Sequence, residues 1–160
     1  MKTLMILRHA KSPHSEGVDD HERAIFPAAR REIADLARQL AAAGLVPAVV
    51  LSSDAVRAAE TARAYSLAVA GPEPVRLSAL YEPGESADLL AAVQGCGGEA
   101  GIVLVVGHNP GMEDFCNRLT KHPEVDRLGT GTLAVFEVGI DSWPELRFGQ
   151  ARLTRFVPSH

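Results

Sequence analysis

The chain has 160 residues, of which 46% are hydrophobic, so it is long enough to bury the core of one domain without a disulfide or a structural metal. Its formal net charge of -4 gives no overall basic field that would attract nucleic acid or an anionic membrane, so any anion must be bound by a local group of cations. Its two cysteines, Cys96 and Cys116, lie far apart without the spacing of zinc ligands, which is typical of a reducing compartment.

The N-terminal apolar run at residues 4–7 is too short for a signal-peptide core, and Arg8 ends it. No later apolar run approaches the roughly 18 residues of a membrane span. We therefore expect a single cytoplasmic domain over residues 1–160 that binds neither membrane nor nucleic acid. Arg8 and His9 stand side by side where a buried first strand ends, which is where open α/β sheets bind ligands.

A long loop and an amphipathic helix follow this strand. Residues 11–23 are polar and lack apolar periodicity, which indicates a loop over the strand end. From about residue 28 the apolar side chains recur at helical spacing. Pro27 suits the first turn of this helix, and Gly44 suits its C-terminal stop.

Residues 48–51 form a continuous apolar run that predicts a second buried strand. The run ends in Ser52-Ser53-Asp54, three good N-cap residues, before an alanine-rich segment that reaches about Val69. A strand, a cap and a helix are thus expected in this order. Arg57 would lie in the first turns of that helix, from where its side chain can return to the end of the strand.

The second half of the chain continues the alternation of strands and helices. Residues 75–77 favour a short strand, and residues 86–93 a helix that Gly95 closes. Residues 102–106 form the clearest buried strand. Gly107-His108-Asn109-Pro110-Gly111 follows directly, so a second histidine stands at a strand end. Residues 132–138 and 152–157 are rich in β-forming side chains and predict two late strands.

This alternation predicts an α/β fold, with a mainly parallel central sheet and helices on both faces. Right-handed crossovers place the carboxyl ends of all parallel strands on one edge of the sheet. Arg8, His9, Ser52 and His108 should therefore converge there, and the side chain of Arg57 can return to the same edge. Two arginines present planar groups of donors that can bind phosphate oxygens and offset their negative charge.

Three ordered motifs carry a family resemblance: Leu-Arg-His-Ala at residues 7–10, Ser-Ser-x-x-x-Arg-Ala-x-x-Thr-Ala at 52–62 and Gly-His-Asn-Pro at 107–110. Over nearly the whole chain this set resembles the histidine phosphatase superfamily. The Arg-His-Ala-Lys-Ser opening, the small size and Thr-Gly-Thr-Leu-Ala at 130–134 are most similar to SixA-type phosphohistidine phosphatases. The resemblance implies a phosphoglycerate mutase-like three-layer sandwich.

The resemblance also implies a mechanism. His9 would be the nucleophile that takes the phosphoryl group, and water would then hydrolyse the phosphohistidine intermediate. Arg8 and Arg57 would flank the phosphoryl group, and His108 would contact its oxygens from the opposite side. No metal and no other cofactor is implied, and two arginines facing one pocket would repel a divalent cation.

The chemistry sets requirements for both histidines. His9 can attack only through a free lone pair, so its other ring nitrogen should donate to a backbone carbonyl that fixes the tautomer. His108 would serve best when protonated, because it could then donate a hydrogen bond to the transferring group.

Two further residues carry family roles with less support. Arg23 falls where related phosphatases can bring another arginine into the phosphate site, but the Pro-Leu that often follows it in the family is Ala24-Ile25 here. Glu82 occupies the segment that supplies the general acid in related mutases and phosphomonoesterases. It is equally compatible with a rim position, because the imidazole of phosphohistidine leaves readily once it is protonated.

The resemblance favours hydrolysis of phosphohistidine on a protein such as a phosphotransfer domain, because the chain lacks the long insertions that cover the pocket in many small-substrate relatives. One alternative is a phosphomonoesterase or mutase of the same superfamily that acts on a small phosphate ester. Another is a non-catalytic module that holds a phosphorylated partner. The presence of His9 speaks against the non-catalytic module. The oligomeric state is left open.

Overall fold

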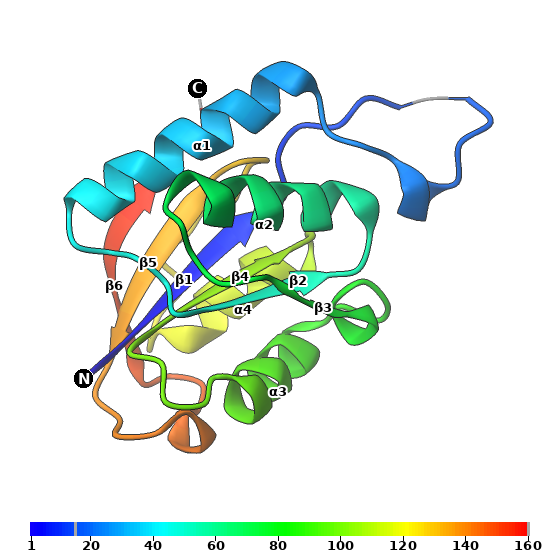
Figure 1. Ribbon diagram of the computed structural model, residues 1–160. Helices are drawn as coiled ribbons and strands as arrows, with labels where there is room; N and C mark the ends of the chain where they lie inside the picture. The colour runs from blue at the N-terminus through cyan, green and yellow to red at the C-terminus, as the bar shows by residue number, and fades with distance from the viewer. Residues whose placement is uncertain (15, 160) are drawn as a thin grey trace.

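A computed structural model describes residues 1–14 and 16–159 of the chain. Within them, six strands form a single sheet in the order β3-β2-β4-β1-β5-β6 (Figure 1). The pairs β1–β4, β2–β4 and β2–β3 are parallel, whereas β5 pairs antiparallel with both β1 and β6. The strands are β1 (Lys2–Arg8), β2 (Val49–Ser53), β3 (Val75–Leu77), β4 (Ile102–Gly107), β5 (Leu133–Val138) and β6 (Ala151–Val157).

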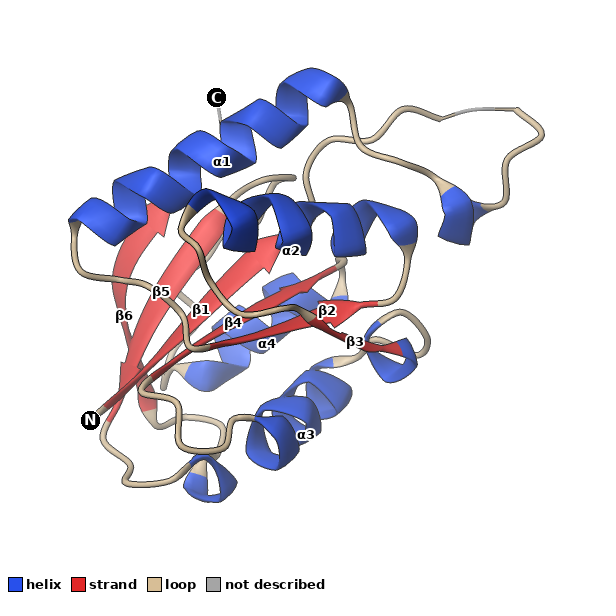
Figure 2. Ribbon diagram, viewed as in Figure 1, coloured by secondary structure: helices blue, strands red, loops and turns tan. Residues whose placement is uncertain are grey.

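Helices cover both faces of the sheet (Figure 2). The buried side chains of α1 (Pro27–Ala42) and α2 (Val56–Ala68) pack on one face, and those of α3 (Ser86–Cys96) and α4 (Gly111–Leu119) pack on the other. Three short 3₁₀ turns complete the elements of the described residues: η1 (Asp20–Glu22), η2 (Ser78–Leu80) and η3 (Trp143–Glu145). The molecule is therefore the three-layer α/β sandwich that the sequence predicts.

Burial on both faces explains why β1 reads as an unbroken apolar run. Leu4 and Ile6 pack on the α3 and α4 side, whereas Met5 and Leu7 pack on the α1 and α2 side. All four side chains are fully buried. Burying an aliphatic side chain of this size stabilises a fold by about 1.5–3 kcal/mol, so β1 is a firm support for the residues that follow it.

Two predicted helix boundaries are wrong. Ser52 and Ser53 do not cap a helix, because β2 continues through Ser53 and α2 begins at Val56 with no side-chain cap. The third helix passes through Gly95, where an added Cβ would meet nothing, and ends before Gly97. At Gly97 a Cβ would lie 2.4 Å from the Trp143 ring, so close packing requires the glycine there.

Two further findings concern the described residues. None of their helices combines the length and the apolar character needed to cross a membrane. Both cysteines are unpaired: Cys116 is buried in the core and Cys96 is exposed.

Candidate active site

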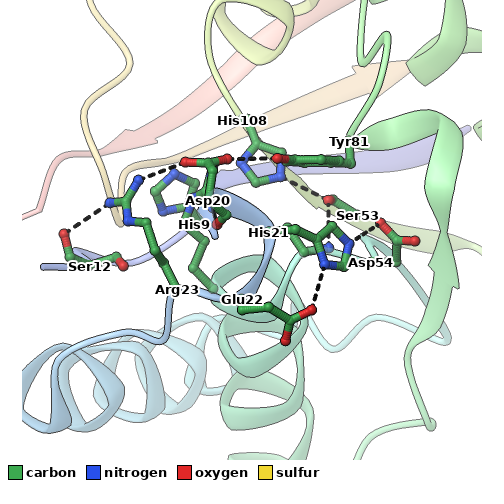
Figure 3. A network of polar contacts seen from close by, with 12 residues as sticks. His9, Ser12, Asp20, His21, Glu22, Arg23, Ser53, Asp54, Tyr81 and His108 are labelled. Carbon is green, nitrogen blue, oxygen red and sulfur yellow. Dashed lines mark hydrogen bonds and ion pairs between the residues drawn. The ribbon is translucent and has the colours of Figure 1, made fainter. Parts of the chain in front are cut away.

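Two histidines meet at the carboxyl edge of the sheet. His9 follows the last residue of β1 and His108 follows the last residue of β4, and these two strands are parallel neighbours. Their ring centroids lie 5.1 Å apart (Figure 3). Two imidazoles that are distant in the sequence are thus close neighbours in the fold.

The ring of His9 is oriented by a short chain of hydrogen bonds. Its Nδ1 donates to the Ala10 carbonyl at 2.8 Å, and the Ala10 amide donates to Thr61 Oγ1 at 2.9 Å. The Thr61 hydroxyl in turn donates to the Arg57 carbonyl at 2.7 Å. Thr61 on α2 therefore fixes the peptide that holds the ring. Nε2 of His9 keeps its lone pair and faces the site.

The backbone behind His9 is held by the segment that contains the Thr-Gly-Thr-Leu-Ala motif. The Gly131 amide donates to the carbonyls of Arg8 and His9, both at 3.0 Å, and the Arg8 amide donates to the Thr132 carbonyl at 3.2 Å. Gly131 has a φ of +68°, a left-handed conformation that glycine adopts without strain. This motif therefore positions the first two site residues.

His9 is neutral at physiological pH. Burial is the main cause that lowers its pKa to about 4, and the charges of Arg57 and Arg8 lower it further, whereas the bond to the Ala10 carbonyl acts in the opposite direction. Only 7% of the residue is exposed. The free nitrogen is therefore available as a nucleophile over the whole physiological range.

His108 is neutral as well, so the prediction of a protonated His108 is wrong for the ligand-free protein. Burial, with the neighbouring His9 and Arg57, lowers its pKa to about 3. Its Nε2 lies 2.8 Å from Ser53 Oγ, at the end of β2. Its Nδ1 is buried and has no hydrogen-bond partner among the residues that the structure describes.

Arg8 and the histidine side of the site share one anchor. Arg8 Nη1 donates to the Leu128 carbonyl at 3.3 Å, and Asn109 Nδ2 donates to the same carbonyl at 2.8 Å. Arg8 Nε is buried and has no partner within residues 1–14 and 16–159. Burial and nearby cations lower the pKa of Arg8, but a guanidinium stays charged at physiological pH.

An aspartate that we did not predict binds the arginines of the site. Asp20, in η1, accepts hydrogen bonds at Oδ2 from Arg57 Nη2 at 3.0 Å and from the Tyr81 hydroxyl at 2.7 Å. Its Oδ1 accepts from Arg23 Nη1 at 3.0 Å (Figure 3). These donors, Tyr81 first, hold the pKa of Asp20 well below its usual range. The carboxylate thus occupies the cationic site as an ionised group.

The loop that carries Asp20 is attached to the start of α2. His21 Nε2 lies 3.0 Å from Asp54 Oδ1, and this carboxylate is the main cause of the raised pKa of His21. Farther along the loop, the Ile25 amide donates to Glu60 Oε1 at 3.0 Å. These contacts fix the path of the loop across the strand ends.

The predicted site residues fall into two groups. The charges of Arg57 and Arg8 act on both histidines, and Arg23 joins them through Asp20 with its side chain only 13% exposed. Glu82 is exposed, and its carboxylate forms no hydrogen bond or ion pair with the described residues. The sequence signal that would have indicated Asp20 is the charged run Asp19-Asp20-His21-Glu22-Arg23 in a loop over a strand end.

Within residues 1–14 and 16–159 no group of three or more His, Cys, Asp or Glu side chains is placed to hold a metal ion.

Solved structures with this fold include SixA proteins. SixA from Nakamurella multipartitia matches with a TM-score of 0.86 and 25% identity, over 99% of this chain and 96% of that one. SixA from Agrobacterium tumefaciens matches with a TM-score of 0.80 and 26% identity, over 98% and 97%. The chain is thus similar over nearly its whole length to SixA phosphohistidine phosphatases, which belong to the histidine phosphatase superfamily.

A structure of lower identity and one curated sequence are also similar to this chain. A mycobacterial glucosyl-3-phosphoglycerate phosphatase matches with a TM-score of 0.69 and 14% identity over the full length of both chains. An uncharacterised chloroplast protein of Arabidopsis thaliana is 26% identical over 90% of this chain and 70% of its own length. No family model matches the chain. This fold alone therefore does not select a substrate within the superfamily.

Proposed function

We propose that this protein is a phosphatase that transfers a phosphoryl group to His9 and then to water, and that its substrate is phosphohistidine on another protein. One observation carries the proposal. The neutral His9 has its Nδ1 bound to a carbonyl and its Nε2 free, and it faces His108 inside a group of arginines. A positioned nucleophile among fixed cations is what phosphoryl transfer requires.

Two displacements at phosphorus complete the reaction. In the first, the substrate imidazole carries a proton from solvent on its non-phosphorylated nitrogen; the Nε2 lone pair of His9 forms a bond to phosphorus while the P–N bond of the substrate breaks, and the imidazole leaves as a neutral ring that keeps the electron pair. In the second, a water oxygen attacks phosphorus, the bond to His9 breaks, and inorganic phosphate leaves as the water proton passes to solvent. Arg8 and Arg57 offset the negative charge that spreads over the oxygens in both steps.

The acid chemistry of the site supports a nitrogen leaving group. Release of an alkoxide needs a strong proton donor, whereas a protonated imidazole leaves without one. The Glu82 carboxylate is exposed and forms no hydrogen bond with the described residues, and both His9 and His108 are neutral. The site thus suits a phosphoramidate better than an alkyl phosphate.

A groove next to the site supports a protein substrate. Arg8 is one of the residues that line an open groove of about 1070 Å³ between α1 and β6, and neither His9 nor His108 is among them. Phe26 and Phe156, both partly exposed, also line it. A groove of this volume beside the cations has room for a polypeptide segment that flanks a phosphorylated side chain.

The test is labelling followed by turnover. After brief exposure to radiolabelled phosphoramidate, the wild type should carry acid-labile phosphate and His9→Ala should carry none, with circular dichroism confirming that the variant is folded. The wild type should also hydrolyse a phosphohistidine protein with a higher kcat/KM than p-nitrophenyl phosphate or sugar phosphates. A higher kcat/KM on the esters would favour a small-molecule phosphomonoesterase. Absence of both labelling and turnover would leave a binding module.

A further inference from the structure

The hydroxyl of Ser53 faces two groups. The Ala55 amide donates to Ser53 Oγ at 3.1 Å, and His108 Nε2 lies 2.8 Å from the same oxygen. Ser53 is fully buried. Because an amide can only donate, the Ala55 contact uses Ser53 as an acceptor and leaves its hydroxyl proton to be placed elsewhere.

Counting donors and acceptors places that proton. If His108 carried its proton on Nε2, Ser53 Oγ would accept two hydrogen bonds, and its own buried hydroxyl proton would have no acceptor among the described residues. If Nε2 of His108 is the bare nitrogen, the Ser53 hydroxyl donates to it and every group in the contact is satisfied. A buried donor left without a partner costs about 1–3 kcal/mol, so the second arrangement is favoured.

We infer that Ser53 is a positioning residue, whose hydroxyl donates to Nε2 of His108 and thereby keeps the ring proton on Nδ1, directed at the phosphoryl oxygens. The inference deepens the proposed function and rests on it for the identity of the bound group. It also accounts for the buried Nδ1 of His108, which has no partner among the described residues. That atom is a donor in the ligand-free protein, and the oxyanion supplies its acceptor.

The two imidazoles then present different ring nitrogens to the phosphoryl group. Both are neutral and both carry their proton on Nδ1, but His9 directs its bare Nε2 at phosphorus, whereas His108 directs its N–H at an oxygen. In the other tautomer, a lone pair of His108 would face a negative oxygen and repel it. His108 has a pKa of about 3 and is therefore neutral at physiological pH. It can still donate a hydrogen bond to an oxyanion, because its Nδ1 carries a proton.

Ser53→Ala tests the inference, and Ser52→Ala is a matched control. Ser52 is the preceding residue of β2 and is equally buried, but its hydroxyl donates to the Ser53 carbonyl at 2.7 Å. Both variants therefore remove one buried hydroxyl from the same strand, and Ser53→Ala also removes the acceptor of the Ala55 amide. Only Ser53→Ala removes the partner of His108.

The first readout is the tautomer of His108, measured from ¹⁵N chemical shifts of histidine-labelled protein and assigned with His108→Asn. The wild type and Ser52→Ala should show the proton on Nδ1, and Ser53→Ala should show a mixture of tautomers. A proton on Nε2 in the wild type would overturn the inference even if Ser53→Ala does not fold. An unchanged tautomer in a folded Ser53→Ala protein would overturn it as well.

The second readout is anion binding. The affinity for tungstate, a tetrahedral oxyanion, should fall roughly tenfold or more in Ser53→Ala and little in Ser52→Ala, and kcat/KM on a phosphoramidate should fall about 10²-fold, as for other lost oxyanion donors. Equal losses in the two variants would indicate a merely structural role and contradict the inference. The tautomer and the tungstate affinity need no turnover, so they test Ser53 even if the proposed activity is not found.

Discussion

Arg57 binds Asp20 through both of its terminal nitrogens, because Nη1 donates to the Asp20 carbonyl at 2.7 Å and Nη2 donates to its carboxylate at 3.0 Å. The side chain of Arg57 is 9% exposed, so these bonds lie in a partly desolvated site. An arginine that is to bind a phosphoryl group is therefore already paired with an internal anion. A substrate must displace that carboxylate or share the arginine with it.

Replacing Asp20 with Asn should strengthen oxyanion binding. The change removes the competing charge but keeps the side-chain shape, and because the Asp20 side chain is 53% exposed, the gain should be modest, roughly 2- to 10-fold in the Kd for tungstate. Titration calorimetry can measure it. Asp19→Asn is the control, since that neighbouring carboxylate is exposed and forms no hydrogen bond or ion pair with the described residues. Weaker binding by Asp20→Asn would mean that Asp20 mainly holds Arg57 in place.

Replacing Arg57 with Ala should remove stabilisation of the transition state. We expect kcat/KM on a phosphoramidate to fall by about 10²- to 10³-fold, which corresponds to about 3–4 kcal/mol. Arg63→Ala, an exposed change on the same helix, should leave kcat/KM within a factor of two or so of the wild type. Equal activity of Arg57→Ala and Arg63→Ala would show that Arg57 serves only to hold Asp20.

The nucleophile should titrate well below an ordinary histidine. Because burial lowers the pKa of His9 to about 4, the ring stays unprotonated, and kcat/KM should fall only as the pH drops through that value rather than through about 6.5. A ¹⁵N titration of the His9 ring separates this effect from ionisation of the substrate. A midpoint near 6.5 for His9 would contradict the structure.

The same two histidines should make the fold sensitive to acid. In the folded protein the pKa values of His9 and His108 are about 4 and about 3, so between these values and about 6.5 the unfolded chain binds more protons than the folded one. The free energy of unfolding should therefore fall as the pH is lowered through this window, by on the order of a few kcal/mol. Urea unfolding at a series of pH values measures it. His9→Gln should show a shallower slope, and parallel curves would be evidence against the lowered pKa.

Glu82→Gln should separate the two leaving groups. If Glu82 donates a proton only to oxygen leaving groups, the variant should lose at least tenfold in kcat/KM on an alkyl phosphate and little on phosphohistidine. The matched control is Glu85→Gln at the start of α3, whose carboxylate belongs to a helix cap. Small and equal effects on both substrates would assign Glu82 to the rim.

The sequence predicted the features that depend on strand ends and short-range patterns. The apolar runs located the strands that carry His9 and His108, and parallel topology brought these residues together. The role of Asp20 depends on the path of a loop that has no periodicity, so the charged run that contains it did not by itself bring the carboxylate to the site. The charge state of His108 depends on burial, which spacing alone does not give. The sequence predicts Ser53 as a helix cap because serine is frequent at helix N-termini. In the structure β2 continues through Ser53, and the helix begins three residues later.

The Leu128 carbonyl described above accepts from Arg8, which is the last residue of β1, and from Asn109, which adjoins His108. The Leu128 amide is held in turn by Glu113 Oε2 at 3.0 Å. A shift of this one peptide would move the Arg8 guanidinium and the Asn109 side chain, which adjoins His108, together. Substitutions in the connection between α4 and β5 should consequently also reduce catalytic activity.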